Sequence, residues 1–216
     1  NSGGSARRWF GNNEKVVNWE NNGADIKRDK LEKLEVGLCL PSNSKPKNEQ
    51  YYFLPSITWT KIATSTFGVR LCRQGFVFDI AGSSAFPENK NLYLSAAFLN
   101  SKVAADFLQL LNPTVNIQTG DIGNLPWLCD ALEIHRSEIS ATCERAVNTA
   151  MADWDSEETS WDFTTLPLLQ PDHRAETLED TYTALRTHWQ GMTDEMQRLE
   201  EENNRIFIDA YGLQDE

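Results

Sequence analysis

The stretch LEDTYTALRTHWQGMTDEMQRL, residues 178–199, decides the fold of this chain. Its apolar side chains recur in alternating steps of four and three residues, a heptad spacing that places them along one side of a helix. Ile206 and Ala210 continue this seam beyond the polar Asn203. The spacing therefore predicts one long helix that must bury an apolar seam. The seam residues are Leu178, Tyr182, Leu185, Trp189, Met192, Met196 and Leu199.

A second helix is predicted over residues 128–151, where apolar residues from Leu128 to Ala150 have a similar spacing. The segment between the two helices contains Trp154, Trp161 and Phe163. We expect the two helices to pack antiparallel, because each then buries apolar surface that neither could bury alone, with the aromatic residues covering one end. The alternative is a coiled coil between two copies of the chain. The intramolecular pair is favoured because a partner helix of matching length lies just upstream.

The first part of the chain has a different pattern, with short apolar or alternating runs separated by turn-forming residues. This pattern predicts a compact mixed sheet. One helix is predicted over residues 91–111, ended by Asn112-Pro113. The predicted fold is α+β: a small mixed-sheet domain in residues 1–126, then a long antiparallel helical pair in residues 127–216. The strand-like runs are residues 34–40, 51–54, 57–62, 69–72 and 76–80, and one of the separating turns is residues 81–84.

Charge is divided unevenly between these two parts. The whole chain has a formal net charge of −12. Residues 1–125 contain 14 Lys and Arg against 11 Asp and Glu, or +3, whereas residues 126–216 contain 6 against 21, or −15. The first part can therefore face phosphates, and the second should be a solvated helical surface.

Composition indicates a cytoplasmic protein. Four widely separated cysteines, Cys39, Cys72, Cys129 and Cys143, indicate reduced thiols rather than a disulfide scaffold. No apolar run is long enough for a membrane helix, and the polar amino end does not resemble a signal peptide. The histidines have no metal-ligand spacing, so no metal site is predicted. Because the sequence opens on Asn1, we expect it to be a piece of a longer protein.

The sequence predicts no catalytic residue. It contains no glycine-rich phosphate loop and no Gly-x-Ser-x-Gly motif. Asn112-Pro113-Thr114-Val115 begins like the Asn-Pro-Pro-Tyr loop with which amino-methyltransferases hold a flipped adenine, but it lacks the second proline and the stacking aromatic. No loop for S-adenosylmethionine is apparent either. We therefore expect no cofactor in this segment.

Basic and hydroxyl residues of the first part are candidates for contacts with duplex DNA. Arginine and lysine neutralise phosphates, and arginine also pairs with base edges. Two serines after a strand, preceded by Gly82, can donate hydrogen bonds to a phosphate. The alternative for Arg70 is an ion pair with Asp79 across a hairpin. The predicted DNA-binding residues are Arg7, Arg8, Lys61, Arg70, Arg73, Ser83 and Ser84.

Many ordered segments resemble the C-terminal part of PglX-type methyltransferases, the adenine-specific DNA methyltransferases of BREX phage-defence systems. RWFGN at residues 8–12 and FDIAGSS at residues 78–84 match in the first part. GDIGNLP at residues 120–126 and NRIFIDAYGL at residues 204–213 match further along. The stretch from LNSK, residues 99–102, to DIGNLP is also similar to the end of target recognition domains in TaqI-like methyltransferases and type I restriction specificity subunits.

This resemblance implies a small domain that reads DNA, followed by helices that act as a spacer. It implies double-stranded DNA, an upstream methyltransferase domain and other defence-system proteins as partners, and no membrane. The parent protein would be an S-adenosylmethionine-dependent adenine-N6 methyltransferase, while the segment itself would be non-catalytic. The alternative is a protein-interaction or dimerisation module that acts through the acidic helical half. A self-contained nuclease has little support, since no carboxylate cluster stands out.

Overall fold

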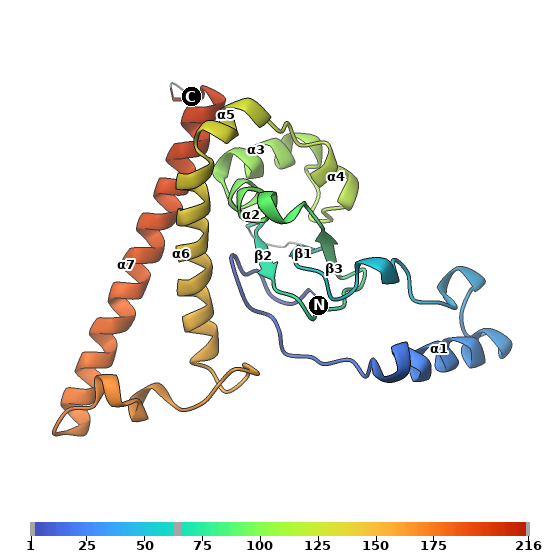
Figure 1. The fold of residues 1–216 in the computed structure, drawn as a ribbon, viewed down its shortest axis with the longest axis horizontal. Coiled ribbons are helices and arrows are strands. Elements are labelled where there is room, and N and C mark those ends of the chain that lie inside the picture. The colour runs from blue at the N-terminus through green and yellow to red at the C-terminus, as the bar shows by residue number, and fades with distance from the viewer. Residues whose placement is uncertain (1–2, 63–65, 215–216) are drawn as a thin grey trace.

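The computed structural model describes residues 3–62 and 66–214. The fold is α+β, as predicted: a small sheet with short helices, followed by two long helices (Figure 1). The long helices run in opposite directions and approach each other most closely near the carboxyl end of the chain. Helix α1, Glu20–Glu35, projects on the other side of the sheet. No helix in the described ranges has the length and apolar character to cross a bilayer.

The sheet contains β1 (Ser56–Thr60), β2 (Val69–Cys72) and β3 (Gly82–Ala85) in the order β2-β1-β3, with both pairs antiparallel. Ile57 of β1 lies opposite Leu71 of β2 and Ala85 of β3. A single parallel bridge joins Trp9 to Arg70, so the amino-terminal segment covers the free edge of β2. The bridge lies outside the three strands, so the sheet itself is antiparallel rather than mixed as predicted.

The predicted strands at residues 57–62 and 69–72 are confirmed, but three others are wrong. Residues 34–40 form the end of α1 and a turn at Gly37, whose φ of +72° suits glycine. Residues 51–54 continue from a short 3-10 helix, Glu49–Tyr51, and residues 76–80 form no strand. Conversely, β3 occupies residues predicted as a turn. Its pairing with β1, supported by a 3.0 Å bond from Thr58 Oγ1 to the Ser83 carbonyl, outweighs its lack of apolar side chains.

The helix predicted over residues 91–111 is two helices, α2 (Leu92–Leu99) and α3 (Lys102–Leu111). Asn100 and Ser101 separate them for identifiable reasons. The Asn100 side chain accepts from the Val69 N–H at 2.8 Å and donates to the Val69 carbonyl at 3.0 Å. Ser101 caps α3 by accepting from the Ala104 N–H. The stop at Asn112 is confirmed, and the short helix α4, Thr119–Gly123, follows.

The helical pair consists of α6 (Arg136–Asp155), preceded by the short α5 (Cys129–Ile134), and α7 (Leu178–Tyr211). Two 3-10 turns, Pro167–Leu169 and Pro171–His173, lie in the connection between α6 and α7. Thr177 caps the start of α7, and Gly212 ends it in the left-handed conformation.

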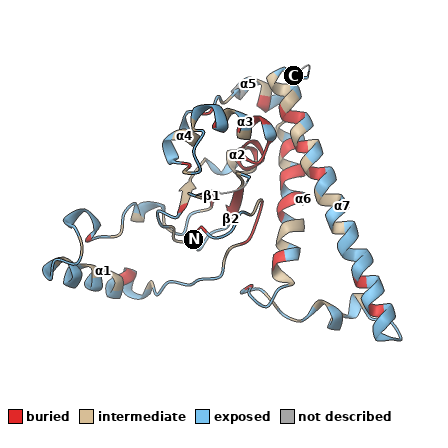
Figure 2. Cartoon of the chain, turned by 180° about the vertical axis from the view of Figure 1, so that it is seen from behind, coloured by how far each residue is buried: buried red, intermediate tan, exposed pale blue. Residues whose placement is uncertain are grey.

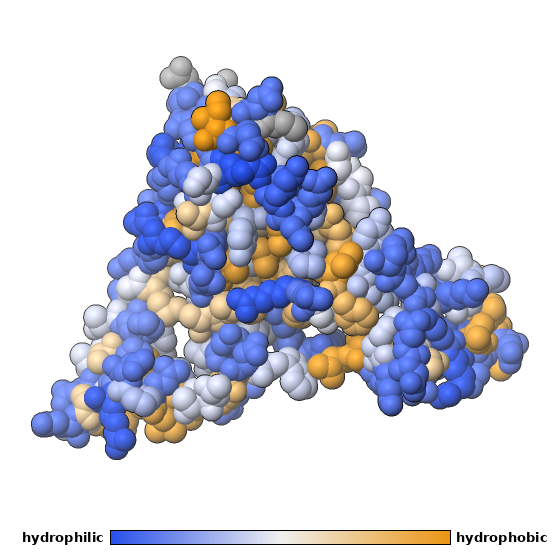
Figure 3. All heavy atoms as spheres, viewed as in Figure 1, coloured by the Kyte–Doolittle hydropathy of each residue, from blue (hydrophilic) through white to orange (hydrophobic). Residues whose placement is uncertain are grey.

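Only part of the apolar seam of α7 is buried. Leu199 and Ile206 are 1% exposed, whereas Leu178 is 72% exposed and Tyr182 is 48% exposed. Figure 2 shows the burial concentrated where α7 approaches α6. At the other end of the pair, which we call the open end, α6 and α7 diverge and are joined by residues 156–177. Trp161 in this connection is 65% exposed, so the expectation that the linker aromatics cover this end is wrong for Trp161. Hydrophilic side chains cover most of α7 and of the projecting α1 region in the view of Figure 3.

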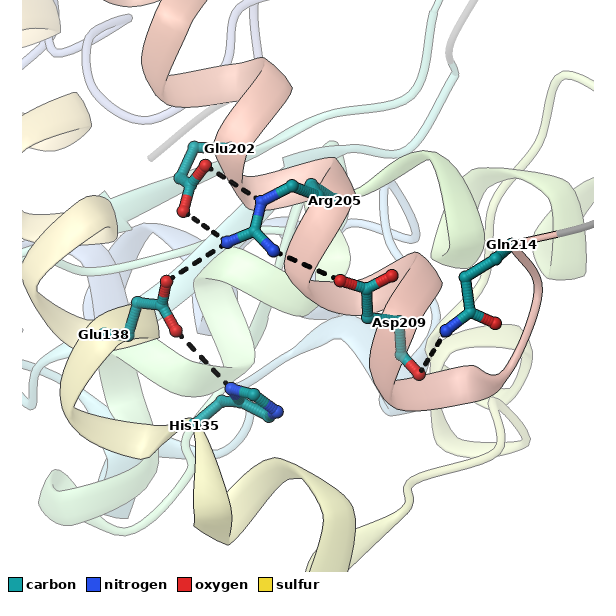
Figure 4. Close-up of polar contacts among 6 residues, drawn as sticks. All are labelled: His135, Glu138, Glu202, Arg205, Asp209 and Gln214. Carbon is teal, nitrogen blue, oxygen red and sulfur yellow. Dashed lines mark hydrogen bonds and ion pairs between the residues drawn. The ribbon is translucent and has the colours of Figure 1, made fainter.

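Polar contacts reinforce the end of the helical pair where α6 and α7 lie closest, near the carboxyl end of the chain (Figure 4). Arg205 of α7 contacts Glu202 at 2.7 Å, Asp209 at 3.1 Å and Glu138 of α6 at 3.3 Å. The hydrogen bond from Arg205 lowers the pKa of Glu202. These partners are partly exposed to solvent, which weakens their ion pairs, so the apolar seam is the larger stabilising term.

We expect Asn100→Ala to lower the free energy of unfolding by about 1–3 kcal/mol, because it leaves the buried Val69 N–H without its acceptor. The Val69 carbonyl keeps the Trp9 N–H as a donor at 2.8 Å. Urea unfolding measures the change. Asn89→Ala, at an exposed position, is the matched control. Equal stability of the two variants would contradict the role of Asn100.

Candidate nucleic-acid interface

The amino-terminal segment places Arg7 and Arg8 between the sheet and the helical pair. The Trp9 N–H donates to the Val69 carbonyl at 2.8 Å, and its indole Nε1 donates to Glu200 of α7 at 2.9 Å. Arg8 forms an ion pair with the same carboxylate at 3.1 Å. Arg7 lies 3.5 Å from Asp153 and stacks over the Trp154 ring at 4.8 Å. Both arginines are therefore engaged by acidic residues of the helices.

Arg70 is 1% exposed. Its Nη1 donates to Thr60 Oγ1 at 3.3 Å and its Nη2 to the Gly3 carbonyl at 3.1 Å, while its buried Nε has no hydrogen-bond partner. Burial lowers its pKa, and the nearby charge of Arg7 lowers it further. The alternative ion pair with Asp79 is wrong, because that carboxylate instead accepts from the Ala81 and Gly82 N–H groups.

Arg7 and Arg70 line the same cavity, which has a volume of about 210 Å³. Thr60, Thr66 and Phe67 also face it. The half-buried Lys61 lies between two other lining residues in sequence, and its backbone bonds to Ala81 and Ile117. The structure thus brings the predicted residues Arg7 and Arg70 together, with Lys61 beside them.

Arg73 lies elsewhere. It is exposed just after β2 and lines a second cavity of about 400 Å³ with Lys15, Gln74 and Trp161. Asp155 and Asp162 line the same cavity, so its charge is mixed. Amide, aromatic and guanidinium groups of this kind suit contacts with base edges and sugars.

Ser83 and Ser84 lie on β3, at the opposite edge of the sheet from β2. Both are half-buried. The Ser84 hydroxyl donates to the Gly82 carbonyl at 3.3 Å, and the Ser83 carbonyl is occupied by Thr58. The seven predicted residues are consequently distributed over three places rather than gathered in one cleft.

The structure adds three cations that the sequence pattern did not single out. Lys15, Lys45 and Lys47 are exposed, and no ion pair joins them to a carboxylate within the described ranges. Lys45 and Lys47 follow α1 in the projecting part of the chain. The sequence could identify them as basic residues, but their freedom from carboxylates depends on the tertiary arrangement. In the part of the chain that the structure describes, no cluster of three potential metal ligands occurs.

No family model matches this sequence. Two curated proteins match it almost from end to end. An adenine-specific methyltransferase PglX from Lacticaseibacillus casei (strain Zhang) is 36% identical over 220 residues, covering 100% of this chain and 18% of that protein. An adenine-specific methyltransferase BrxX from Escherichia coli O9:H4 (strain HS) is 29% identical over 214 residues, covering 98% of this chain and 16% of that protein.

The chain is similar to PglX-type methyltransferases over its whole length. This confirms the resemblance carried by the segments from RWFGN to NRIFIDAYGL. The chain spans less than a fifth of the length of these PglX-type relatives.

Proposed function

We propose that this chain is the DNA target recognition module of an adenine-N6 DNA methyltransferase of a phage-defence system. The observation that carries the proposal is that this chain is similar to adenine-specific methyltransferases from end to end. Its own sequence contains neither a cofactor loop nor a complete adenine-holding loop. In the parent protein, S-adenosylmethionine would bind to the upstream methyltransferase domain. Residues 1–126 contact duplex DNA, and residues 127–216 set the spacing to the rest of the enzyme.

The exposed cations of the first part are the proposed phosphate contacts. Arg73, with Lys15 beside it, needs no rearrangement to meet DNA, because both are exposed. Arg7 and Arg8 meet DNA by exchanging a carboxylate of the helical pair for a phosphate. Lys61 contributes from the end of β1, beside the start of β3 where Ser83 and Ser84 lie, and Arg70 acts from inside its cavity.

Exchange of the first part between related enzymes tests the proposal. A full-length PglX from Lacticaseibacillus casei whose segment matching residues 1–126 is replaced by this chain's own should methylate a different sequence. Replacement of the segment matching residues 127–216 should leave the methylated sequence unchanged. Sequencing of modified adenines in cells measures both. An unaltered methylation site in the first chimera, with methylation retained, would overturn the assignment of recognition to residues 1–126.

Single substitutions test the proposed contacts. Arg7→Gln, Arg8→Gln, Lys61→Gln and Arg73→Gln should each weaken binding to a mixed-sequence duplex. Each should also lower the slope of log K against log salt by about 1, because one phosphate contact is lost. Fluorescence anisotropy at several salt concentrations measures this. The matched control is Arg186→Gln, at an exposed position of α7. A variant with wild-type affinity and slope would remove its residue from the interface.

One observation favours a second candidate, a protein-interaction module. Several apolar side chains are exposed at the end of the helical pair where α6 and α7 diverge, and exposed apolar surface is a feature of protein-interaction sites. These lie in the connection between α6 and α7 and in the first turns of α7: Trp161, Leu166, Leu169, Leu178, Tyr182 and Trp189. A second copy of the chain could cover them.

For this candidate we expect light scattering to detect a dimer that forms with rising protein concentration. Higher salt should strengthen the dimer. Each copy has a helical half of charge −15, and salt screens the repulsion between the helical halves of the two copies. Leu178→Ser should abolish the dimer, while Leu110→Ser, at an equally exposed site on α3, should not. A monomer at every concentration would contradict self-association through this end.

A further inference from the structure

We propose that the cavity lined by Arg7 and Arg70 is an anion-binding site that takes a single phosphate group. This inference deepens the proposed function, on which its biological meaning rests. A phosphate of the DNA backbone and the phosphate of a small molecule share the same chemistry, and the experiment below separates these two sources.

The charge of the cavity is the first argument. Among the described residues, its lining contains two guanidinium groups and no carboxylate. Two larger cavities of the described chain differ in this respect: the one beside Arg73 includes Asp155 and Asp162, and the one beside Arg8 includes Asp153 and Glu200. Two nearby cations disfavour each other, and Asp153, the carboxylate beside Arg7, lies outside the lining, so the cavity favours an anion.

The second argument is the condition of Arg70. A guanidinium taken out of water needs a counter-charge and partners for its donors. Arg70 has only neutral partners, Thr60 and the Gly3 carbonyl, and its buried Nε has none. No ion pair to Arg70 occurs in the described ranges. An anion in the cavity supplies the missing charge.

The third argument is that specific hydrogen bonds and a required glycine determine the shape of the cavity wall. Asn12 Nδ2 donates to the Gly3 and Ser5 carbonyls at 3.0 and 2.8 Å, which fixes the shape of the segment, and Thr60 Oγ1 of β1 donates to the Gly4 carbonyl at 3.2 Å, which holds it against the sheet. Gly4 has a φ of +95°, and a Cβ there would lie 2.8 Å from Asn12 Nδ2, so the wall depends on glycine. The enclosed volume of about 210 Å³ suits one phosphate group, and lies below the roughly 300–1,000 Å³ of pockets for drug-sized molecules.

The order of contact follows from exposure. Thr66 is exposed at the rim and Arg7 is partly exposed, so an entering phosphate meets these residues first. Arg7 can turn from Asp153, whose oxygen is 3.5 Å away, to the phosphate, because that ion pair is long and open to solvent. Arg70 then acts as the fixed charge at the bottom of the site. No bond is made or broken in this binding step.

Thermal unfolding of the 216-residue chain with inorganic phosphate tests the site. A ligand that binds the folded state alone raises the melting temperature with its concentration. We expect a rise of at least about 2 °C relative to potassium chloride of equal ionic strength. Arg7→Gln and Thr66→Glu should remove this rise, the first by loss of a cation and the second by repulsion at the rim.

Two controls separate binding from general salt effects. Arg186→Gln removes an exposed arginine of α7 that does not line the cavity, and should keep the rise. The Thr66→Gln side chain has the size of the glutamate in Thr66→Glu but no charge, so this variant should also keep the rise in melting temperature. Stabilisation through exclusion of phosphate from the protein surface would be the same in all variants. No rise in the wild type, or an equal rise in Arg7→Gln and Thr66→Glu, would overturn the proposal.

Duplex binding then identifies the source of the phosphate. If the site takes a backbone phosphate, Thr66→Glu weakens duplex binding relative to Thr66→Gln, and inorganic phosphate competes with the duplex. If duplex affinity is the same in both variants while the thermal effect differs between them, the site stands and its ligand is a small phosphate compound. Duplex binding without any phosphate effect would overturn the site and leave the proposed function standing. A phosphate effect in a chain that binds no duplex would support the site and overturn the proposed function.

Discussion

The fold depends on the burial of helix α2 between the sheet and the helical pair. Ala96, Ala97 and Phe98 of α2 are at most 1% exposed, and no residue of this short helix is fully exposed to solvent. Fully burying a side chain such as Phe98 stabilises the fold by roughly 1.5–3 kcal/mol. The α2 side chains belong to one continuous core with Trp59 of the sheet and Phe207 of α7. The sheet and the long helices are thus held together through a helix that contacts both.

Two asparagines provide the polar partners that such burial requires, because buried backbone groups must be hydrogen-bonded. Asn100 joins the end of α2 to Val69 of β2, and Asn203 of α7 donates to the Ala97 carbonyl at 3.0 Å. Asn203 interrupts the apolar seam of α7 where a leucine would continue it. Its position is explained by this contact, which fixes the register of α7 against α2.

The heptad spacing predicted α7 because that information is local: the helix repeat alone determines which side chains share a face. The sequence also predicted β1 and β2, whose apolar runs are bounded by turn residues. It failed at β3, where Gly82-Ser83-Ser84 has no apolar pattern and the strand exists through pairing with β1. It failed again at Asn100, where the partner lies 31 residues away in sequence. Non-local partners are invisible to periodicity.

The candidate site also combines features that the sequence predicts with features that depend on non-local contacts. Residue type predicts that Arg7, Arg70 and Arg73 carry positive charge, but not what each one faces. The fold pairs Arg7 with Asp153, leaves Arg73 exposed, and buries Arg70 with neutral partners. The cavity between Arg7 and Arg70 arises only because Trp9 is bridged to β2, which brings residues more than 60 positions apart to the same place.

The ion pairs from the amino-terminal segment to α6 and α7 connect the basic first part of the chain to the acidic helical pair. Arg7 and Arg8 contact Asp153 of α6 and Glu200 of α7, so the acidic helices neutralise two cations of the basic part. Such partly exposed pairs contribute about 0–1 kcal/mol each, so a phosphate can replace the carboxylate at little cost. Trp9 differs, because its indole is buried and donates to Glu200 at 2.9 Å. The backbone at Trp9 can therefore stay fixed on β2 and α7 while the neighbouring arginine side chains change partners, which keeps the helical pair attached to the sheet when the arginines turn toward an anion.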